Sequence, residues 1–316
     1  MAVGKQKQTS RATILVTGAL GQVGFELARS MRSVGKVIAL DRSAFDLCEP
    51  NQMCSVIRAI KPAVIVNAAA YTAVDAAESN RSLAMQVNAK ALSILVDEAR
   101  RIGASIIHYS TDYVFSGEKE LPYIEEDKAS PKNFYGVSKL AGEQVIASAG
   151  ICYLILRTSW VYSMRGKNFL STMLRLGREQ DTIKVIADQF GSPTWSHTIA
   201  AMTVHIAEKA LNAYDTQQWW QERSGIYHLT AAGSTSWNGF AKAIFNAMIM
   251  ERVPTIMPIF THEFPMRVNR PKNSCLSNNK LKRVFGLQPP RWDRALKLCL
   301  RLHGHYKLST ITNPSL

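Results

Sequence analysis

The sequence lacks the cysteine framework on which a small secreted protein or a zinc protein would depend. Its five cysteines are odd in number, and none of them forms a C-x-x-C pair. A disulfide scaffold and a zinc site are therefore not indicated. We expect reduced thiols in a protein located in the cytoplasm.

Long apolar runs are also missing, since none approaches the roughly 20 residues that a membrane helix needs. The apolar segment ATILVTGAL at 12–20 is interrupted by Gly18 and is soon followed by Gly21. It has no small-residue cleavage site of the kind that ends a secretory signal. We expect a first β-strand there, after a flexible tail at 1–11, and no membrane partner.

Acidic residues are scarce in the two segments that carry most of the net charge of +14. Residues 1–11 hold three basic side chains and no acid, and residues 267–304 hold ten, including Arg267, against Asp293 alone. A basic segment of this kind suits nucleic acid, an anionic substrate or a solvated helix face. Because no nucleic-acid motif accompanies it, we expect no nucleic-acid partner.

What the sequence does contain is a regular alternation of strand-like and helix-like segments. Runs rich in β-branched residues occupy 12–18, 37–42, 63–70, 105–111 and 153–159, with amphipathic segments between them. Nearly continuous apolar strands separated by helices are typical of a parallel sheet covered on both faces. We predict an α/β protein with a Rossmann-type, doubly wound parallel sheet.

The alternation becomes less regular after residue 160, where possible strands at 183–188 and 225–230 lie among several helices. We therefore expect two domains and two tails. The expected divisions are a flexible tail at 1–11, an NAD(P)-binding domain at 12–162 with parts of 183–230, a smaller interleaved substrate-binding domain at 163–182 and 231–304, and a tail at 305–316.

Glycines mark the end of the first expected strand. Gly18, Gly21 and Gly24 form G-x-x-G-x-x-G where the first helix should begin. Glycines permit a tight turn and a close approach to a pyrophosphate, and the helix N-terminus offers free N–H groups to the phosphates. The same residues would suit an ordinary turn, so the motif indicates a dinucleotide only together with other signals.

A carboxylate stands at the spacing that such a cofactor requires. Asp41 lies 20 residues after Gly21, at the end of the second expected strand, where a carboxylate accepts hydrogen bonds from the adenosine ribose. Arg42 follows it and would suit the 2′-phosphate of the alternative cofactor. NADH and NADPH both remain open, with a slight preference for NADPH.

The stretch FYGVSKLAGE places Tyr135 and Lys139 four residues apart on an expected helix. Residues at this spacing are neighbours, and an ammonium beside a phenol lowers the pKa of the phenol from about 10. Such a phenol is a better proton donor near neutral pH. Ser110 and Thr111 end the strand at 105–111, at the edge where open α/β sheets bind ligands, so their hydroxyls are candidates for holding a carbonyl oxygen.

Seven segments, taken in order, resemble the extended short-chain dehydrogenase/reductases and, more closely, the dTDP-4-dehydrorhamnose reductase family. They are GALGQVG, NAAAYTAVDAAE, HYSTDYVFSG, FYGVSKLAGE, RTSWVY, DQFGSPT and RPKNSCL, and the resemblance covers about residues 12–303. It implies NAD(P)H-dependent reduction of the 4-keto group of dTDP-4-dehydro-L-rhamnose. That reaction is the last step of dTDP-rhamnose biosynthesis and serves lipopolysaccharide or cell-wall polysaccharide synthesis.

The same resemblance implies roles for individual residues. Tyr135 would be the proton donor, Lys139 would lower its pKa and bind the nicotinamide ribose, and Thr111 would position the carbonyl. The cofactor would be bound by Gly18, Gly21, Gln22, Val23, Gly24, Asp41, Arg42, Asp46, Leu47, Ala69, Ala70, Tyr71 and Thr72, with Tyr135 and Lys139. The dTDP-sugar would contact Thr111, Asp112, Tyr113, Trp160 and Arg270, with the basic segment near its diphosphate.

Other functions within the superfamily stay open. Sugar-nucleotide dehydratases carry Asp-Glu after the threonine, whereas Asp112 is followed here by Tyr113, which favours simple reduction. The regulatory subunit of methionine adenosyltransferase also resembles these reductases and binds NADP without known sugar reduction. The presence of Thr111, Tyr135 and Lys139 argues against that alternative. Another sugar-nucleotide reductase, including one that acts on a UDP-sugar, is a further alternative.

Two departures from the family concern a metal and the diphosphate. Some members dimerise through magnesium held by acidic residues after the GxPT segment, where this chain has Trp195, Ser196 and His197. His197 fits a helix start better than a ligand, so we expect no metal, while a homodimer of another kind stays open. Cys275 replaces an arginine that is usual in the family, and Arg270 remains available for the diphosphate.

Overall fold

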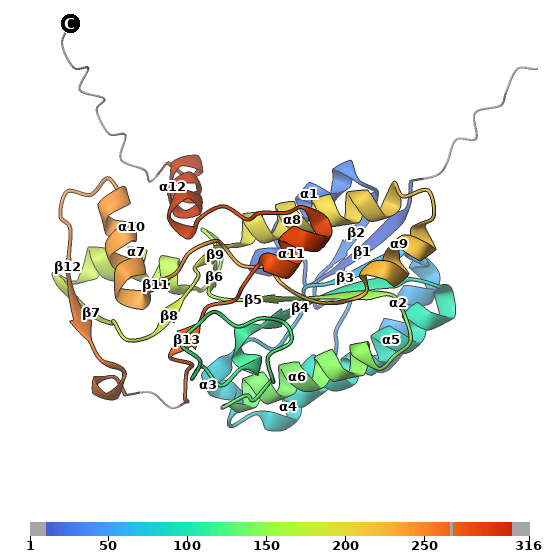
Figure 1. Cartoon of the computed structure of the whole chain (residues 1–316), viewed down its shortest axis with the longest axis horizontal. Coiled ribbons are helices and arrows are strands. Elements are labelled where there is room, and N and C mark those ends of the chain that lie inside the picture. Colours follow the sequence, from blue (N-terminus) through green and yellow to red (C-terminus); the bar gives the residue numbers. More distant parts are fainter. Residues whose placement is uncertain (1–10, 266–267, 305–316) are drawn as a thin grey trace, which may run out of the picture.

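The computed structural model describes residues 11–265 and 268–304. Residues 1–10 of the first expected tail, the whole expected tail at 305–316 and Arg267 of the basic segment lie outside the described residues. The predicted doubly wound α/β fold is confirmed. Six parallel strands form a central sheet in the order β10-β5-β4-β3-β1-β2, and helices cover both of its faces (Figure 1).

The central strands arise where the apolar runs were expected, with small differences at their ends. Their bounds are β1 (Thr13–Thr17), β2 (Lys36–Leu40), β3 (Val64–Asn67), β4 (Ser105–Thr111), β5 (Tyr153–Thr158) and β10 (Gly225–His228). The chain passes from β1 outward to β2 and then returns to the other side of β1 as β3. This reversal creates a crevice at the carboxyl ends of β1 and β3, where doubly wound sheets bind ligands.

One face of the sheet is covered by α1 (Gln22–Ser30), α8 (Ser196–Leu211), α9 (Thr216–Arg223) and α11 (Asn279–Phe285). The other is covered by α2 (Pro50–Ile60), α5 (Ala91–Ile102) and α6 (Phe134–Ala147). Successive side chains of β1 point to opposite faces of the sheet. Ile14 and Val16 pack on the α1 side, and Leu15 packs on the α2 side. All three side chains are fully buried, which explains the continuous apolar run in the sequence.

A third hydrophobic core lies beside the sheet. It is formed by α7 (Phe169–Glu179), β7 (Thr182–Ile186), α10 (Trp237–Ala247), β12 (Thr255–Ile259) and α12 (Trp292–Leu302), which lie together at the left of Figure 1. The strand expected at 183–188 belongs here, since β7 pairs with β12 and not with the central sheet. The strand expected at 225–230 is β10, which pairs with β5 at the sheet edge.

Short strands form two smaller sheets outside the central one. They are β6 (Val161–Tyr162), which pairs with β9 (Thr194–Trp195), and β8 (Phe190–Gly191), which lies between β11 (Thr235–Ser236) and β13 (Asn273–Ser274).

Short helical segments complete the chain. They are η1 (Met31–Ser33), α3 (Val74–Ala77), α4 (Arg81–Met85), the π-helical turn η2 (Gln86–Lys90), η3 (Asp112–Val114) and η4 (Thr261–Glu263). Among the described residues, none of the helices combines the length and the apolarity that a bilayer crossing requires.

Candidate active site

The glycine turn lies at the carboxyl ends of β1 and β3. Gly18 has φ of +67°, a conformation that favours glycine, and a Cβ added there would come within 2.8 Å of the Ala69 backbone nitrogen. Gly24 has no room for a side chain either, because a Cβ would lie 2.7 Å from the Gly18 carbonyl carbon. The turn is therefore packed directly against Ala68 and Ala69 at the end of β3, as a site for close backbone approach requires.

The first turn of α1 is open to an anion. Gly21 is its N-cap residue and is exposed, and no side chain caps the helix there. The N–H groups of this turn lack partners within the helix, and the helix dipole favours negative charge at this end. Gln22 links the turn to the beginning of α7, since its Oε1 accepts hydrogen bonds from Ser163 Oγ at 3.0 Å and Asn168 Nδ2 at 2.9 Å.

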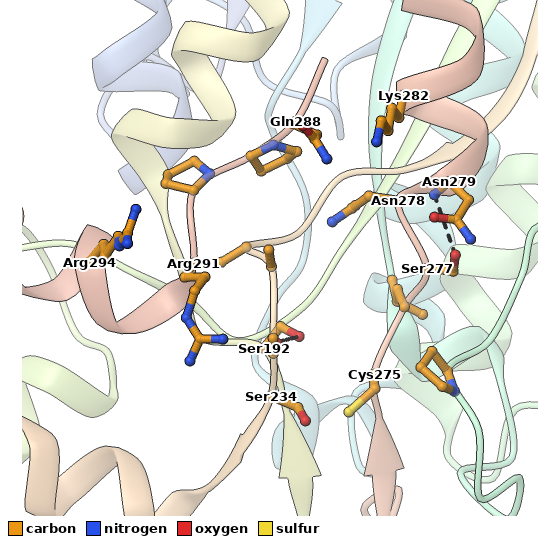
Figure 2. Close-up of a pocket in the computed structure, with 17 residues that line it drawn as sticks. Ser192, Ser234, Cys275, Ser277, Asn278, Asn279, Lys282, Gln288, Arg291 and Arg294 are labelled. Carbon is orange, nitrogen blue, oxygen red and sulfur yellow. Dashed lines mark hydrogen bonds between the residues drawn. The ribbon is translucent and has the colours of Figure 1, made fainter. Parts of the chain in front are cut away.

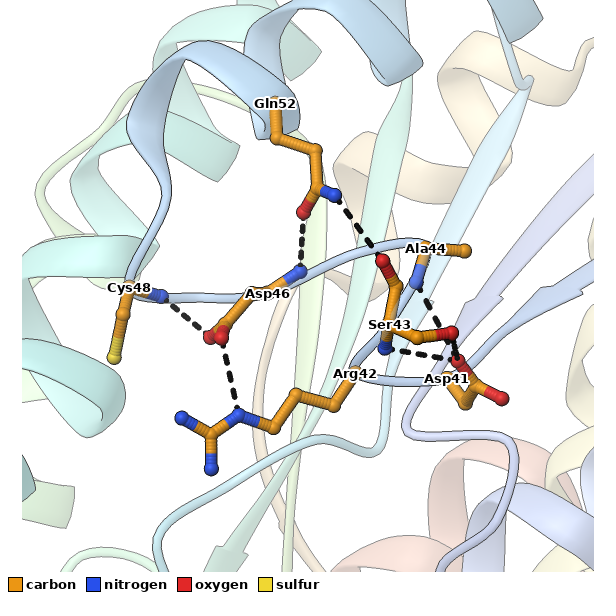
Figure 3. A network of polar contacts seen from close by, with 7 residues as sticks. All are labelled: Asp41, Arg42, Ser43, Ala44, Asp46, Cys48 and Gln52. Carbon is orange, nitrogen blue, oxygen red and sulfur yellow. Dashed lines mark hydrogen bonds and ion pairs between the residues drawn. The ribbon is translucent and has the colours of Figure 1, made fainter.

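Asp41 begins the loop that follows β2 (Figure 3). Its Oδ1 accepts hydrogen bonds from Ser43 N at 2.9 Å and from Ser43 Oγ at 2.6 Å, and these two bonds lower the pKa of the carboxyl. A carboxylate held in this way is ionised and keeps its orientation. It can accept hydrogen bonds from the hydroxyl groups of a ribose.

Arg42 points along the same loop and is highly exposed. Its Nε donates to Asp46 Oδ2 at 3.0 Å, and Asp46 also accepts from Cys48 N at 2.9 Å (Figure 3). The pair is held weakly because it lies at the surface. Leu47, by contrast, is buried in the core on the α2 side of the sheet. The structure thus places Asp41, Arg42 and Asp46 together at the loop surface and Leu47 beneath it.

The segment after β3 is fixed by a residue that the sequence analysis missed. Asn88 lies in the π-helical turn η2, where its Oδ1 accepts from Tyr71 N at 2.9 Å and its Nδ2 donates to Tyr71 O at 3.0 Å. The same amide nitrogen donates to Ser138 Oγ of α6 at 2.9 Å. Asn88 therefore ties Tyr71 and the adjoining Thr72 to the helix that carries Tyr135. A buried Asn within a helical run is the only sequence signal for it.

Tyr135, Lys139 and Thr111 meet at the carboxyl end of β4. Tyr135 and Lys139 lie on successive turns of α6 and are 9% and 1% exposed. Thr111 ends β4, where its hydroxyl donates to Asp112 Oδ1 at 3.1 Å and acts on the Tyr135 phenol by lowering its pKa. Ser110 also lies at the end of β4 and is buried. The predicted catalytic residues are therefore brought together, and they come from two different elements.

Burial dominates the electrostatics of Tyr135 and Lys139. Burial raises the pKa of Tyr135 above its ordinary value, and the Thr111 hydrogen bond opposes this rise only in part. Burial also lowers the pKa of Lys139 to about 8. The lysine amine is directed toward Tyr109 O at 2.7 Å and His108 Nε2 at 3.1 Å. Lys139 is not among the groups that shift the pKa of Tyr135, so the lowering of that pKa by Lys139 stays a prediction.

Asp112 connects the site to the C-terminal part of the chain. It is 3% exposed, and burial raises its pKa to about 6, while the hydroxyls of Ser274 on β13 and Thr111 act in the opposite direction. Tyr113 follows it and packs edge to face on Tyr135, with ring centroids 5.5 Å apart. The Asp112–Tyr113 pair therefore lies around the phenol. Position 113 therefore offers an aromatic ring, and not a second carboxyl, beside the phenol.

Trp160 follows β5 in a strained conformation. Its φ is +48°, which is unusual for a residue with a side chain. The indole stacks on Trp237 at 3.4 Å between centroids and 7° between planes, and it leaves no room for a side chain at Gly191. Strain of this kind persists only where packing over-determines it, which is common at functional sites.

The basic segment lines a cavity of about 650 Å³ (Figure 2). Lys282, Arg291 and Arg294 face it together with Cys275, and its described lining contains no acidic side chain. Arg270 lies elsewhere and forms an ion pair with Asp75 at 2.9 Å. The structure therefore separates Arg270 from the cations of this cavity, and the position of Cys275 is occupied by a small, buried thiol.

His197 occupies the first turn of α8, where its Nδ1 lies 3.1 Å from Glu26 Oε2 of α1. Within the described residues, no group of three or more His, Cys, Asp or Glu side chains is arranged to hold a metal ion.

Comparison with known proteins is consistent with this geometry. The family model described as RmlD substrate binding domain matches residues 12–303. The chain belongs to the dTDP-4-dehydrorhamnose reductase family. A dTDP-4-dehydrorhamnose reductase of Burkholderia thailandensis is 48% identical and covers 91% of this chain and 98% of its own. Its counterpart in Salmonella typhimurium is 42% identical, with 91% and 96% covered.

A solved structure of this family contains a cofactor. The dTDP-4-dehydrorhamnose reductase of Bacillus anthracis, in complex with NADP, superimposes with a TM-score of 0.85 at 34% identity. The match covers 92% of this chain and 99% of that one. The predicted family and fold are thereby confirmed. The glycine turn, the open first turn of α1 and the ionised Asp41 are the features of this chain that fit a dinucleotide of that class.

Proposed function

We propose that the protein is an oxidoreductase that reduces the 4-keto group of dTDP-4-dehydro-L-rhamnose with NADPH or NADH, giving dTDP-L-rhamnose in the last step of its biosynthesis. The observation that carries the proposal is the meeting of Tyr135, Lys139 and Thr111 at the carboxyl edge of the sheet, where the glycine turn also lies, in a chain whose relatives bear that activity in their names. The proposal includes a cytoplasmic location and leaves a homodimer open.

Three residues carry the chemistry in this proposal. The bound dinucleotide supplies the hydride. The Thr111 hydroxyl donates a hydrogen bond to the keto oxygen and holds that oxygen beside the phenol. Tyr135 then transfers its phenolic proton to the oxygen as negative charge develops there. The raised pKa of Tyr135 suits an acid that keeps its proton until the substrate is in place.

The dinucleotide would lie across the crevice between β1 and β3. Gly21, Gln22 and Val23, in the first turn of α1, would bind the pyrophosphate, and Asp41 would bind the adenosine ribose. Further cofactor contacts are proposed for Gly18, Gly24, Asp46, Leu47, Ala69, Ala70, Tyr71 and Thr72. Lys139 would bind the nicotinamide ribose. Arg42 is exposed at the end of β2 and supports the slight preference for NADPH, because its guanidinium can bind a 2′-phosphate.

The sugar nucleotide would lie on the C-terminal side of the catalytic group. We assign Asp112, Tyr113 and Trp160 to its sugar and Arg270 to its diphosphate. The cations of the cavity in Figure 2 are further candidates for its anionic part. In this arrangement the elements of the third core, from α7 to α12, form the substrate-binding domain, and the central sheet with its helices forms the cofactor-binding domain.

The proposal is tested by mixing the purified protein with dTDP-4-dehydro-L-rhamnose and each cofactor, and by identifying the product. We expect oxidation of the cofactor and formation of dTDP-L-rhamnose, with slower turnover of a UDP-linked counterpart. Folded protein that binds NADPH but turns over neither sugar would contradict the proposal. That result would favour the non-catalytic, NADP-binding alternative.

A further inference from the structure

A chain of buried polar side chains crosses the sheet beneath the glycine turn and ends at Lys139. Thr17 Oγ1 of β1 lies 2.6 Å from Asn67 Oδ1 of β3, and Asn67 Nδ2 lies 3.0 Å from His108 Nδ1 of β4. His108 Nε2 then lies 3.1 Å from Lys139 Nζ of α6. All four side chains are at most 1% exposed, so each must satisfy its hydrogen bonds within the chain.

His108 is neutral, because burial and the neighbouring lysine hold its pKa well below the ordinary value. A neutral imidazole has one nitrogen that donates and one that accepts. If Nε2 accepts a hydrogen bond from a charged Lys139, Nδ1 carries the imidazole proton and must donate to Asn67. If Nε2 instead donates, Lys139 must be an uncharged amine with a free lone pair.

The side chains of Asn67 and Thr17 can form their hydrogen bonds whether Lys139 is charged or neutral. The Asn67 amide presents oxygen to His108 in one orientation and nitrogen in the other, and the Thr17 hydroxyl both donates and accepts. The four side chains can therefore reverse the direction of every hydrogen bond without moving apart. The remaining bond, from Lys139 Nζ to Tyr109 O at 2.7 Å, is satisfied by an N–H in both states.

We propose that His108 is a positioning residue for the reduction, which holds the Lys139 amine at the Tyr109 carbonyl and allows it to be charged or neutral while both nitrogens of His108 keep a hydrogen-bond partner. This inference rests on the proposed function for its catalytic meaning.

The ionisable groups around Lys139 show why the ionisation of its amine depends on His108. On α6 itself the nearby ionisable groups are Tyr135 and Glu143, which lie one turn before and one turn after it. Glu143 favours the charged amine, but it is already bound by Arg157 of β5 through two hydrogen bonds of 2.9 and 2.6 Å. Asp112 of η3 acts on Tyr135. His108 is therefore the one ionisable side chain of β4 that contacts the amine directly.

The first test measures the titration of Lys139 by the chemical shift of its 13Cε, assigned by its loss in Lys139→Met. In His108→Leu the charged amine loses an acceptor, so we expect its midpoint to fall by roughly one pH unit, a tenfold change in ionisation. His108→Gln retains a group that can accept or donate, and its midpoint should remain close to that of the wild type. His228→Leu is the matched control, because His228 is a buried histidine on β10, two strands away.

A second variant predicts the opposite direction. In Asn67→Asp the carboxylate can only accept, so it should hold the proton on His108 Nδ1 and leave Nε2 free to accept from a charged Lys139. The Lys139 midpoint should therefore rise. A role confined to packing would not lower the midpoint in His108→Leu and leave it unchanged in His108→Gln.

The basic limb of the kcat profile should shift in the same directions as the Lys139 midpoint. The inference would be overturned if His108→Leu folds and its Lys139 titrates at the same pH as in His228→Leu. If His108→Leu does not fold, an Asn67→Asp variant whose Lys139 midpoint does not rise would overturn it instead. Because the titration needs no substrate, it remains readable if the proposed reaction fails. An active wild type with an unchanged midpoint in these variants would refute the role of His108 and leave the reaction intact.

Discussion

Replacement of Asp112 by Asn should stabilise the protein by an amount that grows with pH. The carboxyl is fully buried, and its pKa is raised to about 6 from an ordinary value of 3.8. Between these values the folded state holds a proton that the unfolded chain has released. Protonation of Asp112 therefore supports the free energy of unfolding of the wild type at low pH, and this contribution is lost as the pH rises through about 6.

The magnitude follows from the difference between the two values. About two pKa units correspond to about 3 kcal/mol once the carboxyl is ionised in both states. At pH 5 only about half of this penalty is expressed. We therefore expect the gain in unfolding free energy of Asp112→Asn over wild type to rise by about 1.5 kcal/mol between pH 5 and pH 7.5.

Urea unfolding of both proteins at the two pH values measures this change. Asn presents an uncharged group of the same shape to Ser274 and Thr111, so the comparison isolates the ionisation. A gain that does not change with pH, or that falls as the pH rises, would refute the reasoning. Turnover of the dTDP-sugar should fall in the same variant, because a costly buried carboxyl beside the phenol is expected where it contacts substrate.

Three further substitutions test other parts of the site. Arg42→Ala should raise KM for NADPH several-fold more than KM for NADH, and an unchanged ratio in steady-state kinetics would remove the preference for NADPH. Gly24→Ala should weaken NADPH binding about tenfold in a fluorescence titration, because the added Cβ would lie 2.7 Å from the Gly18 carbonyl carbon and overpack the turn at a cost of about 1–3 kcal/mol; unaltered affinity would show that the turn adapts. Arg157→Leu should lower the free energy of unfolding by about 3–5 kcal/mol, since it leaves Glu143 buried without its partner, and a loss below 1 kcal/mol would contradict this.

The sequence predicted the central sheet well because its signal is local. Five apolar runs became β1 to β5, and the ends differ where polar groups leave the ladder. Asp41 was expected to end the second strand, but it instead accepts hydrogen bonds from the following turn. The NAAA run likewise leaves the sheet after Asn67, because the chain must pass over the glycine turn.

The site was predictable as a set of residues but not as a set of ionisation states. Spacing placed Tyr135 beside Lys139, yet burial of both groups, which decides their pKa values, depends on helices far apart in the sequence. Asn67 and His108 were missed although each is a polar residue inside a buried strand, a pattern that indicates a required hydrogen bond. The strained Trp160 had no sequence signal, because its conformation results from stacking on Trp237.

The central claim is that Tyr135 supplies the proton in a reduction of a nucleotide-linked keto-sugar. The most direct test is the rate of NADPH oxidation with dTDP-4-dehydro-L-rhamnose for Tyr135→Phe and wild type, with NADPH affinity measured in parallel. We predict unchanged affinity and a loss of turnover of at least about 100-fold, as expected when a general acid is removed. Turnover of Tyr135→Phe close to that of the wild type would contradict the claim.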